Sequence, residues 1–280
     1  MENRLNFEYC DNLIEEFERV IKNPIRKKSS VYYTGVDLGT ACVVLAVLDE
    51  NYKPVAGAYR YADVVKDGMV VDYIGAIKIV RELKQELEEK LGTELIYAAA
   101  AIPPGTDSLD SGAIKNVVQG AGFELTCLLD EPTAANEVLK MTNGAVVDIG
   151  GGTTGTSVLK DGKVIHVVDD ATGGTHFSLV ISGAYNMNFH DADKYKRDYK
   201  NHRELLPVLT PVIEKVASII EKHISNYEVN EIVLVGGTAC LTGLEEVIEK
   251  KLKVYTHKPK NPLFVTPLGI ALSCTQEIIY

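Results

Sequence analysis

Near the middle of the 280-residue chain stands Val146-Val147-Asp148-Ile149-Gly150-Gly151-Gly152-Thr153-Thr154. In this stretch two β-branched residues lead into a carboxylate, and three glycines and two threonines follow it. Glycines lack a Cβ, so consecutive backbone N–H groups can point into one concavity that suits phosphate oxygens, while Asp148 can face the cation that accompanies a phosphate. A tight β-hairpin also uses such glycines, and this stretch alone leaves both interpretations open.

The same chemistry occurs a second time, nearer the N-terminus, in Asp37-Leu38-Gly39-Thr40. Here too a carboxylate leaves a predicted strand and enters a turn of glycine and hydroxyl residues. Two such turns favour phosphate, because they predict two half-sites that close on one phosphorylated ligand between domains, where ligand clefts commonly lie. Magnesium is the expected cation between Asp37 and Asp148, held mostly through waters, because it keeps much of its hydration and shares itself with phosphate oxygens.

The flanks of the two turns repeat as well, so that two halves of hairpin plus helices are predicted. Apolar and alternating patterns predict strands over residues 31–37, 41–48, 54–61, 95–102, 124–129, 155–159, 163–168 and 231–235. Periodicity predicts helices over residues 72–91 and 111–121, with Ile74 on the buried face of the first. Capping patterns predict further helix starts at Asn12, Thr210, Thr242 and Thr266.

A third chemical element is Asp130-Glu131-Pro132-Thr133-Ala134-Ala135. Proline makes the residue before it extended and is favourable in the first turn of a helix, so Glu131 is held at a fixed bend. A carboxylate fixed in this way can orient a water for attack on a γ-phosphate. Alternatively, Glu131 only caps the N–H groups of the helix.

Bulk properties fit a soluble protein that is long enough for two domains. The formal net charge of −10 argues against nucleic-acid binding and against attachment to anionic membrane by general electrostatics. No apolar run approaches the roughly 18 residues of a spanning helix, and the polar start of the chain lacks the form of a secretory signal. Five scattered cysteines without a C-x-x-C pair predict no disulfides and no structural zinc. We therefore expect a cytoplasmic protein without nucleic-acid or membrane partners.

The N-terminal segment has a pattern of its own. Leu13, Phe17, Val20 and Ile21 fall on one face of a predicted helix, and residues 22–30 contain a proline, two serines and four cationic side chains. This composition predicts a solvated linker, which makes the helix an appendage. The helix either lies against the first domain or serves as a docking tag for a partner surface.

Four motifs, in this order, resemble the phosphate-one, connect-one, phosphate-two and adenosine motifs of the actin, DnaK-type chaperone and sugar-kinase superfamily. They are Asp37-Leu38-Gly39-Thr40, Glu131-Pro132-Thr133-Ala134-Ala135, Asp148-Ile149-Gly150-Gly151-Gly152-Thr153 and Val233-Leu234-Val235-Gly236-Gly237-Thr238. Within that superfamily the chain resembles the EutJ family of ethanolamine-utilisation chaperone-like proteins. The closer likeness is carried by residues 62–68, 102–107, 129–133, 147–155 and 171–174.

The resemblance implies an α/β fold, namely a duplicated actin-like (ribonuclease-H-like) two-domain ATPase with a nucleotide cleft between the domains and a reduced second domain. Residues 1–30 would be the N-terminal amphipathic helix and linker. Domain I would comprise residues 31–145, with the C-terminal helix at 266–280 packing back on it, and domain II would comprise residues 146–265.

The resemblance also implies roles for single residues, with ATP or ADP and Mg²⁺ as ligands. Asp37 and Asp148 would be the carboxylates on the magnesium side, and Glu131 would position the hydrolytic water, so that Glu131 and Asp148 are the expected catalytic residues. The expected phosphate loops are Gly39-Thr40 and Gly150-Gly151-Gly152-Thr153-Thr154, and Gly236-Gly237-Thr238 would border the adenosine.

The chain departs from DnaK-type chaperones after Gly174, where a large lobe that sandwiches the purine is replaced by a short segment. The cationic and tyrosine side chains of residues 190–200 can hold an adenine or a phosphate, or they form a solvated charged helix. The sequence therefore leaves the recognition of adenine open.

By resemblance we expect a nucleotide-dependent chaperone-like or assembly protein with slow ATPase activity. Its partners would be ethanolamine-catabolism enzymes or microcompartment shell proteins, and its location the cytoplasm, within or on a bacterial microcompartment. Two alternatives stay open. One is a small-molecule kinase of the same superfamily, which needs a substrate pocket and a base, and the other is a filament-forming ATPase of the MreB or ParM type.

Overall fold

The chain forms two compact units. The computed structural model describes residues 5–26, 28–66, 68–103 and 108–277, the side chains of 108–110 excepted. The first unit comprises Leu5–Lys140 and Phe264–Tyr280, and the second unit comprises Met141–Leu263. The chain therefore leaves the first unit once and returns to it at its C-terminal segment.

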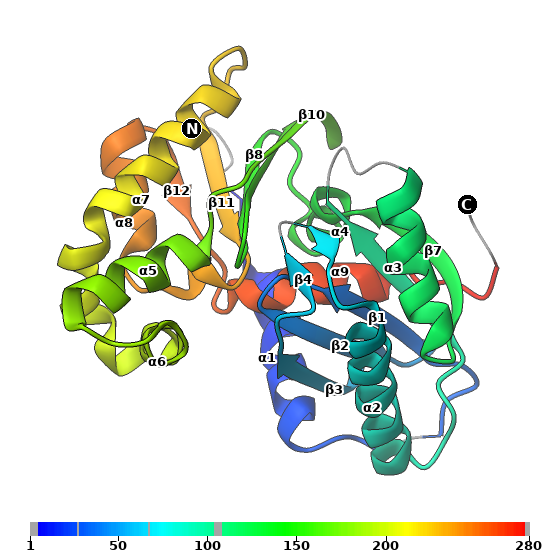
Figure 1. Ribbon diagram of the computed structural model, residues 1–280. Coiled ribbons are helices and arrows are strands. Elements are labelled where there is room, and N and C mark those ends of the chain that lie inside the picture. The colour runs from blue at the N-terminus through cyan, green and yellow to red at the C-terminus, as the bar shows by residue number, and fades with distance from the viewer. Residues whose placement is uncertain (1–4, 27, 67, 104–107, 278–280) are drawn as a thin grey trace. The chain divides into compact units, whose positions relative to one another are not determined.

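The first unit is built on a sheet with the strand order β3-β2-β1-β6-β7 (Figure 1). Strand β2 is antiparallel to β1 and β3, whereas β6 is parallel to β1 and β7. Parallel strands end at the same edge of a sheet, so β1, β6 and β7 bring their carboxyl ends together. The bounds are β1 (Tyr33–Leu38), β2 (Cys42–Leu48), β3 (Pro54–Tyr61), β6 (Tyr97–Ile102) and β7 (Glu124–Asp130), and a separate hairpin is formed by β4 (Val65–Lys66) and β5 (Met69–Val70).

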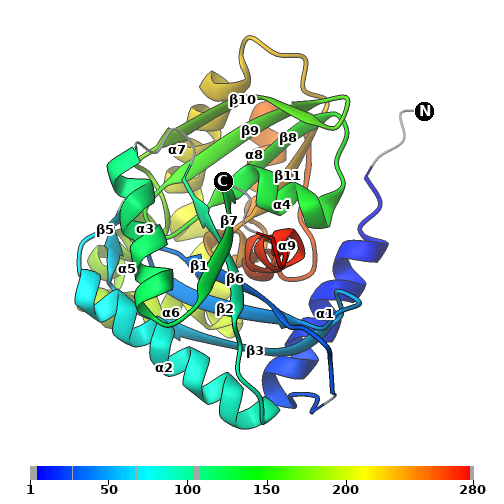
Figure 2. The ribbon, with the colours of Figure 1, turned by 90° about the vertical axis from the view of Figure 1, so that its right-hand side faces the viewer.

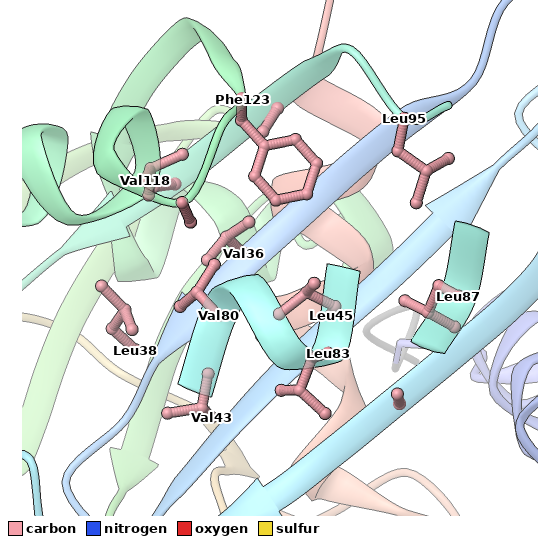
Figure 3. Packing of buried hydrophobic residues seen from close by; sticks show 14 of the residues in the cluster. Val36, Leu38, Val43, Leu45, Val80, Leu83, Leu87, Leu95, Val118 and Phe123 are labelled. Atoms are coloured by element: carbon pink, nitrogen blue, oxygen red, sulfur yellow. The ribbon is translucent and has the colours of Figure 1, made fainter. Parts of the chain in front are cut away.

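One face of this sheet packs against α2 (Tyr73–Leu91) and α3 (Ser108–Gly120). Figure 3 shows aliphatic side chains of β1 and β2 meeting those of α2 in the core between them. The buried stripe of α2 is Ala76, Val80, Leu83, Leu87 and Leu91. Ile74 lies outside this stripe and is 79% exposed, so the prediction that it is buried is wrong.

The other face is covered by α4 (Glu131–Leu139) and α9 (Val265–Ser273), which lie next to each other (Figure 2). A Cβ on Gly35 of β1 would lie 2.5 Å from the carbonyl oxygen of Pro267. A Cβ on Gly269 of α9 would overlap the carbonyl oxygen of Ala134. These two glycines allow α9 to approach both the strand and α4 at backbone distance. The close packing fixes where α4 begins, which matters for Glu131.

The second unit repeats this plan, with the strand order β10-β9-β8-β11-β12. Strand β9 is antiparallel to β8 and β10, and β11 is parallel to β8 and β12. The two sheets thus share one order and one set of strand directions, which confirms the predicted duplication of an α/β unit. The strands are β8 (Gly144–Ile149), β9 (Thr154–Lys160), β10 (Lys163–Asp170), β11 (Glu231–Val235) and β12 (Tyr255–His257).

The helices of the second unit bury Phe177, Ile181, Leu205, Leu209 and Ile213 against β8 and β11. They are α5 (Gly174–Tyr185), α6 (Phe189–Arg197), α7 (His202–Ile224) and α8 (Leu244–Leu252), with the 3₁₀ turns η1 (Tyr199–Asn201), η2 (Thr238–Cys240) and η3 (Pro262–Phe264) in the segments between elements. Over the described ranges of both units, no helix has the length and apolarity that crossing a bilayer requires.

Several predicted helix starts are wrong, and α7 shows why. It begins at His202 and carries both Pro207 and Pro211 inside it, although Thr210 was expected to cap it. The Thr210 hydroxyl instead donates to the carbonyl of Leu206 at 2.8 Å, and burial of Leu205 and Leu209 holds the turns on both sides. Tertiary packing therefore overrides the local proline signal. The other observed starts are Glu8 for α1, Leu244 after Gly243 for α8, and Val265 for α9.

The N-terminal helix α1 (Glu8–Lys22) is packed into the first unit. Phe17 is fully buried, and a Cβ on Gly57 of β3 would collide with its ring. The phenyl ring also meets Phe264 edge to face, with 5.2 Å between the ring centroids. The apolar face of α1 therefore covers β3, which corrects the expectation of an appendage.

The segment after α1 is also held in place. The Ile25 N–H donates to the carbonyl of Val55 at 2.8 Å. The Arg26 guanidinium donates to two carbonyls at the end of α2, those of Glu89 and Lys90, at 2.9 and 2.6 Å. Cationic groups are favourable at a helix C-terminus, so this arginine stabilises α2. Most described residues of 22–30 are exposed, as predicted for a solvated linker, but the segment is tied to the first unit at Ile25 and Arg26.

We expect Phe17→Ala to lower the free energy of unfolding by about 3–5 kcal/mol, because it empties a fully buried site against β3. Urea unfolding measures the change. Glu16→Ala, on the exposed side of the same helix, is the control and should stay within about 0.5 kcal/mol of the parent. Equal stability of the two variants would show that α1 is not part of the core.

We expect Gly269→Ala to destabilise the protein by about 1–3 kcal/mol, because the added methyl group overlaps the carbonyl of Ala134 in an already packed contact. Gly112→Ala in α3 is the matched control. A Cβ there meets nothing within 4 Å, so the change should stabilise the helix by about 0.5–1 kcal/mol. Equal effects of the two substitutions in urea unfolding would contradict the close approach of α9 and α4.

Candidate functional site

The two acid-plus-glycine turns are the same hairpin. Asp148 of β8 pairs with Gly155 of β9, and the Gly150 N–H donates to the carbonyl of Thr153 at 3.0 Å. In the first unit Asp37 pairs with Val44, and the Gly39 N–H donates to the carbonyl of Cys42 at 3.1 Å. In both cases the carboxylate leaves the strand two residues before a glycine that closes the turn.

In the second unit, neighbouring elements bind the carbonyls of this turn. The Gly150 carbonyl accepts from the Gly174 N–H at 2.9 Å and from the Thr238 hydroxyl at 2.7 Å. The Gly151 carbonyl accepts from the N–H and the hydroxyl of Thr175, at 2.7 and 3.0 Å. Two carbonyls of the turn are therefore fixed by the N-terminus of α5 and by the loop after β11.

These bonds set the direction of the amides. In a planar trans peptide the C=O and the following N–H point in opposite directions. Because the carbonyls of Gly150 and Gly151 point at α5 and Thr238, the N–H groups of Gly151 and Gly152 point away from those elements. Successive amides with a common direction form the concavity that binds phosphate oxygens.

Glycines on the neighbouring loops allow this close packing. A Cβ on Gly173 would lie 2.7 Å from the Thr153 nitrogen and 2.9 Å from the Gly150 oxygen. Gly236 has a φ of +90°, and a Cβ there would overlap a carboxylate oxygen of Asp148. Only glycine lets the loop after β11 lie directly against that carboxylate.

The loop 236–238 reaches the turn because β8 and β11 are parallel neighbours, with Val235 opposite Asp148. Both strands end at the same edge, where open α/β sheets place their ligands. The Gly236 N–H donates to the carbonyl of Pro262 at 3.0 Å, which anchors the loop. Gly237 is exposed, while Thr238 is buried beneath the turn.

In the first unit, Glu131 is the first residue of α4, directly after β7. The capping carboxylate is that of Asp130, which accepts from the Thr133 N–H at 2.9 Å and from its hydroxyl at 2.8 Å. The alternative that Glu131 is the helix cap is therefore wrong. Since β1 and β7 are separated only by the parallel strand β6, Glu131 and the turn after Asp37 lie at one edge of this sheet.

Most residues of the charged segment 190–200 are exposed, as expected for a solvated helix, and Lys196 is an exception. The Lys196 ammonium is largely buried and donates to the Gly174 carbonyl at 2.8 Å and to the Ser178 hydroxyl at 2.7 Å. It also pairs with Asp193 at 2.9 Å. Burial lowers the pKa of Lys196 against the opposing effect of Asp193. Burial by itself would raise the pKa of Asp193, but Lys196, Ser178 and Arg197 bring it below its usual value.

The sequence-predicted residues thus fall into two groups, one in each unit. The second unit brings together Asp148, Gly150, Gly151, Gly152, Thr153, Thr154, Gly236, Gly237 and Thr238. The first unit brings Asp37, Gly39, Thr40 and Glu131 to one sheet edge. Sequence reasoning missed Thr175, Ser178 and Lys196 as structural members of the second group. The spacing of Asp193 and Lys196 on one helical face was the available signal.

Two family models match parts of the chain. The model of the MreB/Mbl protein matches residues 55–189, and the model of the type IV pilus assembly protein PilM matches residues 133–262. The structure of MreB 5 of Spiroplasma citri bound to AMPPNP has a TM-score of 0.71 at 18% identity and covers 88% of this chain and 96% of its own. Together with the repeated sheet, these likenesses establish an actin-like fold.

The relatives with much higher identity are ethanolamine utilization proteins named EutJ. The ethanolamine utilization protein EutJ of Salmonella typhimurium is 43% identical over 242 residues, which are 86% of this chain and 85% of the relative. The crystal structure of EutJ from Carboxydothermus hydrogenoformans has a TM-score of 0.90 at 49% identity and covers 94% of this chain and 97% of its own. With this identity over nearly the whole length, the chain belongs to the EutJ family of ethanolamine utilization proteins.

Proposed function

We propose that this EutJ-family chain binds ATP and ADP with Mg²⁺ through the turns at residues 39–40 and 150–154. The observation that carries the proposal is the common direction of the Gly151 and Gly152 amides, which the bonded carbonyls of Gly150 and Gly151 impose. The fold neighbour MreB of Spiroplasma citri has been solved with AMPPNP and with ADP, which supports a nucleotide as the phosphorylated ligand.

The residues present fit a nucleotide and magnesium. A Cβ on Gly150 would meet only the Thr153 carbonyl and the Asp148 carboxylate, at 3.7 and 3.9 Å, and no neighbouring element. Within the described residues, no cluster of three or more His, Cys, Asp or Glu side chains could hold a metal. Magnesium does not need such a cluster, because it is commonly held by one or two carboxylates together with phosphates and water. Asp37 and Asp148 would hold it, and the ion would neutralise phosphate charge.

Glu131 is proposed to orient the attacking water. Its place at the start of α4 is fixed by the Asp130 cap and by the packing of α4 on α9. A carboxylate held in one position can accept the proton of a water that attacks a γ-phosphate. The proposed activity is slow ATP hydrolysis.

At the level of the cell, we propose a chaperone-like or assembly role in ethanolamine utilization. A partner would distinguish the ATP state from the ADP state, and ethanolamine-catabolism enzymes or microcompartment shell proteins are the proposed partners. EutJ relatives support the metabolic setting. The chaperone HscA homolog of Cupriavidus metallidurans, 39% identical in an alignment of 110 residues that covers 36% of this chain and 18% of the relative, supports the type of activity.

We expect Asp148→Asn to weaken Mg²⁺-dependent ATP binding at least about tenfold, because a neutral amide no longer attracts the cation. Titration calorimetry with ATP and ADP, with and without magnesium, measures the effect. Asp161→Asn makes the same change in the turn at the far end of β9 and should bind like the parent. Unchanged magnesium-dependent affinity of Asp148→Asn would refute the proposed site.

We expect Glu131→Gln to bind ATP normally but to hydrolyse it about 10²–10⁴ times more slowly, because the amide cannot accept a proton from water. A phosphate-release assay measures the rate, and Glu137→Gln on the same helix serves as control. Hydrolysis at the parent rate would contradict the role of Glu131. A parent that binds ATP without turnover would contradict the ATPase proposal itself.

A further inference from the structure

The N-terminal part of α7 carries a buried imidazole that touches two segments of the second unit. His202 is 6% exposed. Its Nε2 lies 3.0 Å from the Lys196 carbonyl, at the end of α6, and its Nδ1 lies 3.0 Å from the Thr242 nitrogen, after η2. A backbone N–H can only donate, so Nδ1 is the acceptor and Nε2 carries the proton that the Lys196 carbonyl accepts. The contacts therefore define a neutral imidazole in one tautomer.

Each of the two bonded segments continues to the phosphate turn. On one side, the Lys196 ammonium donates to the Gly174 carbonyl, and the Gly174 N–H donates to the Gly150 carbonyl. On the other side, the chain runs from Thr242 back to Thr238, whose hydroxyl holds the same Gly150 carbonyl. These contacts form a closed ring of hydrogen bonds. One arm runs through α6 and α5, and the other runs through the loop after β11. The two arms meet at the Gly150 carbonyl at one end and at His202 at the other.

Neighbouring groups stiffen both arms. The Asn201 amide donates to the Tyr195 carbonyl at 2.9 Å, next to the carbonyl that His202 binds. The Lys258 ammonium donates to the carbonyls of Ala239 and Leu241, at 3.0 and 2.7 Å, and pairs with Glu245 at 2.5 Å. Among these links, only the imidazole can lose its acceptor nitrogen by gaining a proton on mild acidification.

We propose that His202 is a positioning residue of the nucleotide site: by joining α6 to the loop after β11, it holds Gly174 and Thr238 on the Gly150 carbonyl and so keeps the phosphate-binding amides aligned. This inference rests on the proposed nucleotide function. His202 reaches the ligand only through the backbone of other residues, and it takes no part in the chemistry.

The charges around His202 give the sign of a pH effect. Burial lowers the pKa of His202, and the Lys196 carbonyl opposes this. The Lys258 ammonium lowers the pKa further, and the Asp198 carboxylate raises it, with the net value below the usual one. A proton on Nδ1 would face the Thr242 N–H, so protonation breaks this backbone bond and leaves the Thr242 hydroxyl, 3.0 Å from Nδ1, as the acceptor on this side. Nucleotide affinity should therefore be full at neutral pH and fall as the pH drops below the ordinary histidine value of about 6.5.

The test compares two buried histidines of the same helix. His202→Phe keeps the ring shape but loses both bonds, and we expect it to bind Mg·ADP about tenfold more weakly at neutral pH, with no decline on acidification. His202→Gln retains one donor and one acceptor, so it should recover part of the affinity, without the decline at low pH. His223→Phe is the control, because His223 is 8% exposed and binds the Thr156 hydroxyl of β9 at 2.9 Å, outside the ring. It should keep the affinity and the pH profile of the parent.

A second measurement needs no nucleotide. Hydrogen exchange at the Gly174 and Thr175 amides, which bond the phosphate turn, should become faster in His202→Phe and not in His223→Phe. Parent-like exchange at these amides, or parent-like affinity and pH profile in His202→Phe, would overturn the positioning role. A parent protein that binds no nucleotide would instead overturn the proposed function, and the exchange experiment would still decide whether His202 orders the turn.

Discussion

The carbonyl oxygen of Gly150 is the atom on which the arrangement of the second unit's loops depends. It accepts one hydrogen bond from the N-terminus of α5 and one from the Thr238 hydroxyl in the loop after β11. Both lone pairs are thus used by segments that are far apart in the sequence. Because each such hydrogen bond contributes about 0.5–1.5 kcal/mol, the two segments are held to the turn and to each other. The hydrogen bonds to the Gly150 and Gly151 carbonyls also turn the amides of Gly151 and Gly152 away from α5 and Thr238. The bonds that stabilise the loops are therefore the ones that orient the amides of the proposed phosphate site.

The first unit repeats the hairpin but surrounds it with different elements. Its turn is closed by the same bond, from the Gly39 N–H to the Cys42 carbonyl, and its sheet is covered on one face by α4 and the C-terminal helix α9. Close packing at Gly35 and Gly269 places α4, and the Asp130 cap then places Glu131. One hairpin, used twice, thus lies beside the phosphate-binding amides proposed in the second unit, and in the first unit it shares a sheet edge with Glu131.

Fold likeness and function are supported by different observations. MreB and PilM structures share the fold at 17 to 18% identity, which establishes the common fold and does not by itself establish the ligands or partners of this chain. EutJ relatives establish the family through identity over most of the chain. Support for a nucleotide comes from the two turns, and Gly173 and Gly236 let the neighbouring loops pack directly against the second one. The proposed role of α1 as a docking tag meets a physical constraint, because its apolar face already covers β3.

Local sequence signals were sufficient for the features that depend on neighbouring residues. An acid two residues before a glycine predicted the paired turns, and the proline after Glu131 predicted a helix start, because these signals act within a few residues. Tertiary structure alone decided the rest. The burial of Lys196 needs Gly174 and Ser178 from another helix, and α7 runs through two prolines because Leu205 and Leu209 are held in the core. The free energy of such contacts depends on which distant residues meet, and no local pattern records that.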